Sequence, residues 1–112
     1  MTWEAQVNDV FVVYCTVPNA DVGIAIGRTV VGDGLVACVN VVPGLRSIYR
    51  WEGETCEDGE ALLIMKTTGS RLEAMSVRIR ELHPYEVPEV IALPVCGGWS
   101  PYLDWVRRET EG

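Results

Sequence analysis

The residues most able to carry chemistry are few: one histidine, one lysine and four cysteines in 112 residues. His83 begins the segment His83-Pro84-Tyr85-Glu86, where it could bind a metal ion, act as an acid or base, or serve as a hydrogen-bonded structural residue. Cys15 could supply a soft ligand to an ion such as Cu(I), or it could be a small buried apolar side chain. The spacing of the four cysteines matches no zinc-binding pattern, and we expect them to be free thiols.

Lys66 and an acidic stretch offer weaker signals. Lys66 ends an apolar run and is followed by two threonines, so it could hold an anion or pair with one of the sixteen acidic residues. The segment Glu52–Glu60 contains five acids, which could collect divalent cations weakly or form a solvated surface. Because a single histidine supports no Ser/His/Asp set and no glycine-rich phosphate loop is present, the sequence predicts a binding protein and not an enzyme.

These residues lie on elements whose types follow from the apolar pattern. Runs rich in β-branched and aromatic residues predict four strands: Val10–Val17, Leu35–Trp51 with a bulge at Pro43-Gly44, Ala61–Thr67, and Val90–Pro94 at a sheet edge. Glu52–Glu60 is predicted to be the turn before the third strand. Capping signals predict three helices: Asn19 to about Gly32, a helix opened by the capping box Ser70-Arg-Leu-Glu73 and ended before Pro84, and a short helix with Ser100 as N-cap and Pro101 next.

The order of these elements is β-α-β-β-α-β plus a helix, which is the ferredoxin-like arrangement of an α+β sandwich. The hairpin that includes Leu35–Trp51 is longer than an ordinary strand pair, so we expect it to project beyond the helices that cover the sheet. Such a projection would expose Ile48, Tyr49 and Trp51 to solvent. Exposed aromatic surface usually marks an interface, and we expect the chain to self-associate.

Length and charge limit the classes of function. With 112 residues there is room for one domain, predicted at residues 10–112 after a tail at residues 1–9. The net charge of −7 argues against nucleic acid or an anionic membrane as a partner, because both need a basic surface. No apolar run approaches the ~20 residues of a membrane helix. Since residues 1–9 lack the basic start of a signal peptide, we expect a cytoplasmic protein.

Several segments together resemble the CutA divalent-cation-tolerance proteins, in that family's order and spacing over about residues 10–106. They are Cys15-Thr-Val-Pro18, Ala37-Cys-Val-Asn40, Ser47-Ile-Tyr-Arg-Trp-Glu-Gly53, Lys66-Thr67, His83-Pro-Tyr-Glu-Val-Pro-Glu89 and Tyr102-Leu-Asp-Trp105. The resemblance implies a homotrimer with intersubunit clefts like those of the PII signalling proteins. It also implies tolerance of copper or another divalent cation, with no obligatory cofactor and no catalytic reaction.

The resemblance also implies roles for individual residues. It places the trimer interface at Ser47, Tyr49 and Trp51. It places the ligand cleft at Lys66, His83, Tyr85, Glu86 and Trp51, and it associates Cys15 and His83 with copper. Some family members carry a second histidine where this chain has Leu82, so one subunit has few metal ligands and a site shared between subunits is expected. The alternative is a PII-like signalling module that binds a small ligand in these clefts without handling metal directly.

Overall fold

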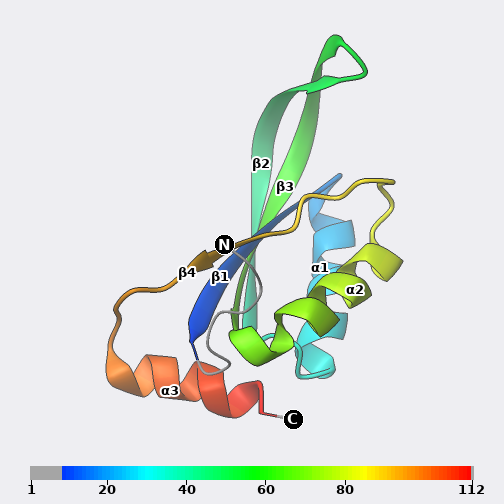
Figure 1. Cartoon of the computed structure of the whole chain (residues 1–112). Helices are drawn as coiled ribbons and strands as arrows, with labels where there is room; N and C mark the ends of the chain where they lie inside the picture. Colours follow the sequence, from blue (N-terminus) through cyan, green and yellow to red (C-terminus); the bar gives the residue numbers. More distant parts are fainter. Residues whose placement is uncertain (1–8, 112) are drawn as a thin grey trace.

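The chain forms a four-stranded antiparallel sheet with two helices on one face, followed by a third helix (Figure 1). A computed structural model describes residues 9–111, so the predicted tail lies outside the described part except for Asp9. The elements are β1 (Val10–Val17), α1 (Ala20–Gly32), β2 (Cys38–Trp51), β3 (Glu54–Thr68), a 3₁₀ turn (Gly69–Arg71), α2 (Leu72–Leu82), β4 (Ile91–Pro94) and α3 (Ser100–Glu109). The spatial order β2-β3-β1-β4 is that of the predicted ferredoxin-like sandwich.

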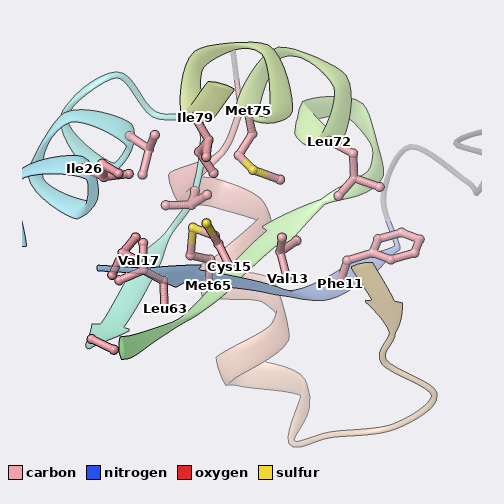
Figure 2. Close-up of a cluster of buried hydrophobic side chains, with 13 residues drawn as sticks. Phe11, Val13, Cys15, Val17, Ile26, Leu63, Met65, Leu72, Met75 and Ile79 are labelled. Carbon is pink, nitrogen blue, oxygen red and sulfur yellow. The ribbon is translucent and has the colours of Figure 1, made fainter. Parts of the chain in front are cut away.

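The main core lies between the sheet and the helices α1 and α2. Alternate residues of β1 and β3 point toward these helices, as the period of a strand requires. They meet the apolar stripes of α1 and α2 (Figure 2). The fully buried members are Phe11, Val13, Cys15, Val17, Ile26, Val30, Val36, Ala61, Leu63, Met65, Leu72, Met75 and Ile79. Leu72, Met75 and Ile79 form the buried face of α2.

The helix α3 packs around a separate, smaller cluster. Val106 is buried there with Val10 and Ala37. The end of α3 is also fixed by polar contacts, because Arg71 Nε donates to the Thr110 carbonyl at 2.8 Å and the hydroxyls of Thr110 and Thr68 lie 3.0 Å apart. These contacts join α3 to the end of β3 and to the 3₁₀ turn. The helix α3 lies at one end of the sheet, away from α1 and α2 (Figure 1).

The strands β2 and β3 form the projecting hairpin that the sequence predicts (Figure 1). The pairing shifts register between Val42 and Leu45, which confirms the bulge at Pro43-Gly44, and Gly44 has the positive φ of 80° that the bulge requires. The predicted turn at Glu52–Glu60 is wrong, because only Glu52 and Gly53 form the turn and β3 begins at Glu54. The arm beyond the helices is exposed on both faces, so its sequence lacks the apolar alternation that marks a strand.

Three predicted boundaries also need correction. Ser70 lies inside the 3₁₀ turn with its Oγ 3.3 Å from Thr68 Oγ1, so the capping box does not form and α2 begins at Leu72. Ser100 is the first residue of α3 and not its N-cap, and in the described part of the chain no side chain caps that helix. The strand β2 begins at Cys38 and not at Leu35, because the Leu35 amide donates to Val30 at the exit of α1. Asn19 caps α1 as predicted, accepting from the Val22 amide at 2.9 Å.

Over residues 9–111, the helices are too short or too polar to cross a membrane.

Candidate functional site

An open groove of about 690 Å³ lies between the projecting hairpin and the connector from α2 to β4. Its lining residues come from β1, the hairpin and the connector: Thr16, Ser47, Ile48, Tyr49, Trp51, Glu60, Pro84, Tyr85, Glu86, Val87 and Glu89. Two of the motifs recognised in the sequence, Ser47–Trp51 and Pro84–Glu89, therefore face one another across a single groove although they are distant along the chain. Of the five residues predicted for the ligand cleft, Trp51, Tyr85 and Glu86 line it.

Tyrosine–carboxylate hydrogen bonds shape this region. Tyr85 Oη donates to Glu60 at 2.5 Å and thereby ties the connector to β3, while Tyr49 Oη donates to Asp58 within the hairpin. Burial and the bond to Glu60 raise the pKa of Tyr85 above its ordinary 10.0. The bond to Asp58 is the main cause that raises the pKa of Tyr49 to about 12. Both phenols therefore stay protonated at neutral pH and act as donors that hold the carboxylates in place.

The charge of the groove is of one sign. Glu60, Glu86 and Glu89 line it, and none of the described lining residues is lysine, arginine or histidine. Carboxylates in a concave surface concentrate field lines and raise the local concentration of cations. The groove is therefore suited to cationic ligands and opposes anionic ones.

His83 lies beneath the groove and does not line it. It follows the last residue of α2, is 7% exposed, and its backbone amide donates to Ile79. His83 Nε2 lies 2.8 Å from the Thr16 carbonyl oxygen, and the Tyr85 amide lies 3.1 Å from His83 Nδ1. Because a carbonyl only accepts and an amide N–H only donates, Nε2 carries the hydrogen and Nδ1 offers its lone pair. His83 thus fixes the start of the connector against β1.

Cys15 approaches the same acceptor from the core side of β1. Its Sγ lies 3.6 Å from the Thr16 carbonyl oxygen. Burial, with smaller contributions from Glu89 and Glu60, raises the pKa of the Cys15 thiol from 9.0 to about 12. The structure therefore brings the two predicted copper ligands, Cys15 and His83, together on one carbonyl. In this arrangement, neither offers a free ligating atom, since the thiol is protonated and both imidazole nitrogens are hydrogen-bonded.

A model of the CutA1 divalent ion tolerance protein family matches residues 11–109 of the chain. The chain belongs to the CutA1 family. It is 50% identical over 99 residues to the divalent-cation tolerance protein CutA of Thermus thermophilus, a match that covers 88% of this chain and 96% of that protein. Human CutA is 50% identical over 98 residues, and there the match covers 88% of this chain but 55% of the relative. This chain thus spans about half the length of some curated relatives.

Solved structures of CutA1 proteins have the same fold. The Thermus thermophilus protein superposes with a TM-score of 0.89 at 49% identity, covering 91% of this chain and 99% of that one. CutA1 from Oryza sativa gives a TM-score of 0.89 at 46% identity, covering 92% and 94%. These matches confirm the predicted family and α+β fold. The predicted function of a divalent-cation tolerance protein is confirmed at the level of the family.

The remaining cleft residue predicted for this CutA chain, Lys66, lies away from the groove. It alternates with the buried Met65 and Thr67 on β3, so it faces the side of the sheet opposite α1 and α2. Its Nζ donates to Asn40 Oδ1 on β2, and the ion pairs recorded within residues 9–111 do not include Lys66. Of the two roles considered for Lys66, the ion pair with an acidic residue is thus replaced, within residues 9–111, by a bond to a neutral amide, and the anion site stays a prediction.

The sequence analysis did not single out Glu60, Glu89 or Thr16 as site residues. Glu89 closes the His83–Glu89 motif, so its place in the motif was an available signal. Glu60 was predicted to lie in the turn, whereas it pairs with Leu45 in the hairpin and accepts a hydrogen bond from the Tyr85 hydroxyl. Thr16 participates through its backbone carbonyl, which no side-chain pattern reveals.

Proposed function

We propose that this CutA chain supports divalent-cation tolerance by binding metal ions, copper among them, in clefts of a homotrimer. The observation that carries the proposal is the groove between the two family motifs, with three carboxylates and no basic residue among its described lining residues. The relatives named above are described as tolerance proteins or simply as CutA, and their names state no catalytic reaction. We therefore propose a binding role, not a catalytic one.

The projecting hairpin supports the trimer. Ile48 is 67% exposed, and Tyr49 and Trp51 are also exposed on an arm that leaves the body of the chain (Figure 1). Apolar surface of this kind is stable in water when a second copy covers it. We propose that Ser47, Tyr49 and Trp51 contact a neighbouring subunit. Light scattering is expected to give three times the chain mass of 12.4 kDa, and a monomeric mass at micromolar concentration would contradict the trimer.

The metal site is proposed to be shared between subunits. Residues 9–111 of one chain bring together no three His, Cys, Asp or Glu side chains that could hold a metal ion. Two or fewer ligands do not fill the coordination sphere of a divalent ion. Carboxylates of the groove, such as Glu86 and Glu89, would supply part of the sphere and the neighbouring subunit the rest.

Cys15 and His83 are a second candidate location, for a soft ion such as Cu(I). Their convergence on the Thr16 carbonyl favours it. Binding there would require the thiol to lose its proton and His83 to give up at least one backbone hydrogen bond.

Calorimetric titration with CuCl₂ separates these locations. We expect binding to weaken at least about tenfold, or about 1.4 kcal/mol, in Glu86→Gln/Glu89→Gln. Glu109→Gln is the control, because it removes a carboxylate charge from an exposed position on α3 that does not line the groove. If Cys15→Ser loses copper binding and Glu86→Gln/Glu89→Gln keeps it, the site is at the second location. Wild-type protein that binds no copper would contradict the metal proposal.

The alternative is a PII-like signalling module that binds a small molecule without direct metal handling. The volume of the groove, about 690 Å³, favours this second function, because it exceeds what a single ion needs and lies within the roughly 300–1,000 Å³ of small-molecule sites. Copper-independent capture of a partner protein by the ligand-loaded trimer would support it.

We also propose a cytoplasmic location. All four cysteines are free, which is typical of proteins in a reducing compartment. Fractionation of the native host, followed by detection of the chain with an antibody, tests this location, and recovery from an oxidising compartment would contradict it.

A further inference from the structure

We propose that the groove binds an aliphatic ion with an ammonium group at each end, that is, an organic diammonium ion. This inference rests on the proposed function in one respect, namely that the groove receives cations. It adds the chemical class of the ligand, which follows from how charge and apolar surface are distributed over the lining residues.

The carboxylates of the groove are dispersed. Glu60 is on β3, whereas Glu86 and Glu89 are three residues apart on the connector, which bends at residues 84–87. Within the described part of one chain they do not gather with other acids, histidines or cysteines into a cluster that could hold a metal ion. A compact ion would therefore meet few of these charges at once. A ligand with two separated positive charges can reach carboxylates on both sides of the groove.

The surface between the carboxylates is apolar and aromatic. On the connector, Tyr85 is 37% exposed and Val87 is 67% exposed, and Pro84 completes this wall, which lies apart from the hairpin residues proposed to contact a neighbouring subunit. Aromatic faces attract ammonium groups, with stabilisation of about 0.5–1 kcal/mol at exposed sites. Aliphatic side chains instead pack against methylene groups, which gain by leaving water. The aliphatic wall residues can therefore contact the methylene chain of an alkyl diammonium ion, and the aromatic faces can contact its ammonium ends. A hydrated metal ion would gain no binding energy from the aliphatic residues.

The anchors are held in place before any ligand binds. Tyr85 Oη donates to Glu60 Oε2, and a carboxylate has about four acceptor positions, so Glu60 keeps capacity for an ammonium donor. Because the phenol already restrains this carboxylate, less side-chain entropy is lost on binding. With no basic residue among the described lining residues, an anionic ligand such as a nucleotide would meet three uncompensated negative charges.

The experiment is calorimetric titration of the assembled protein with 1,6-diaminohexane, with n-hexylamine as the matched ligand that lacks the second charge. We expect the diamine to bind at least about fivefold more tightly than the monoamine and its affinity to fall with added salt. Glu86→Gln/Glu89→Gln should weaken diamine binding at least about tenfold, and Glu109→Gln should leave it unchanged. If the double variant fails to fold by circular dichroism, single Glu89→Gln and the comparison of the two amines carry the test.

The outcomes separate this inference from the metal proposal. A protein that binds CuCl₂ but shows no binding of the diamine, or binds both amines equally, overturns the diammonium ligand and leaves the metal proposal standing. Binding of the diamine that the groove variants do not alter also overturns the inference. Diamine binding that depends on Glu86 and Glu89, in a protein that binds no copper, supports the diammonium ligand and contradicts the metal proposal. Failure of both ligands contradicts both.

Discussion

Cys15 and His83 point at one acceptor, the carbonyl oxygen of Thr16, with Sγ at 3.6 Å and Nε2 at 2.8 Å. The two side chains come from β1 and from the end of α2, so this carbonyl joins the sheet to the connector that lines the groove. His83 continues the link through Nδ1, which accepts from the Tyr85 amide at 3.1 Å. The imidazole thus positions Tyr85, and Tyr85 in turn holds Glu60.

His83→Ala is expected to lower the free energy of unfolding by about 1–3 kcal/mol, because the Thr16 carbonyl and the Tyr85 amide lose their partner in a part-buried region. His83→Gln should lose less, since the glutamine amide can still donate to Thr16. Denaturant unfolding at a fixed chain concentration measures both variants. An alanine variant as stable as wild type would show that the imidazole does not support the connector.

The buried thiol of Cys15 is expected to make the folded state less stable as the pH rises above 9. The folded state keeps the thiol proton up to its pKa of about 12, whereas an unperturbed thiol has a pKa of 9.0. The unfolded state therefore gains by ionising first, so the contribution of Cys15 is complete below pH 9 and is lost between pH 9 and 12.

The check is the unfolding free energy as a function of pH for wild type and Cys15→Ala. The variant is expected to be less stable at neutral pH, because it leaves a small cavity, but to lose less stability between pH 9 and 12. Parallel curves for the two proteins would contradict the raised pKa. A thiol reagent at about pH 8 offers a second readout, in which exposed Cys96 reacts quickly and buried Cys15 does not.

The sequence predicted the parts of the fold that bury an apolar face. The apolar run Val10–Val17 identified β1, and alternate residues of that strand, Phe11, Val13 and Cys15, lie in the core. The length of the hairpin was also predictable, because Leu35–Trp51 is longer than an ordinary strand. Where no core face exists, as in Glu54–Glu60, polar residues on both faces concealed a strand. Ser70 shows a related failure, since its hydroxyl lies near Thr68 Oγ1 within the 3₁₀ turn and does not cap α2.

The candidate site was predicted in part. The motifs named Trp51, Tyr85 and Glu86, which line one groove of this chain because the spacing of a family preserves which segments meet, whereas their place in a cleft between subunits stays a prediction. Lys66 does not line this groove, since its alternation with Met65 assigns it to the other side of the sheet, and its place in a cleft between subunits stays a prediction. The bond between Tyr85 and Glu60 was not predictable, because it depends on the path of the connector after Pro84.

Gly23 is expected to tolerate no side chain, since α1 lies close to the sheet there. A Cβ at this position would come within 2.9 Å of Leu63 Cδ2 and 3.1 Å of Val17 Cγ2, both in the main core. Gly23→Ala should therefore destabilise the fold by about 1–3 kcal/mol in spite of the better helix propensity of alanine. Gly32→Ala is the matched control at the end of the same helix, where nothing lies within 4 Å, and it should be neutral or slightly stabilising. Equal melting temperatures for the two variants would contradict the close approach.

The pKa of Tyr85 is expected to be raised because the phenol is partly desolvated and because Glu60 accepts a hydrogen bond from its hydroxyl. Burial is the larger cause of the raised pKa, and the hydrogen bond and charge of Glu60 add to it. Glu60→Gln removes the negative charge but keeps an acceptor, so the phenol of Tyr85 should titrate at lower pH than in wild type while remaining above 10.0.

Near-ultraviolet absorbance followed through an alkaline titration reports the phenolates, and subtraction of the Tyr85→Phe curve isolates this residue among the four tyrosines. Glu54→Gln is the control, because it removes a carboxylate from the tip of the same hairpin strand without touching Tyr85. Unchanged ionisation of Tyr85 in Glu60→Gln would mean that the tie between the connector and β3 is not formed in solution.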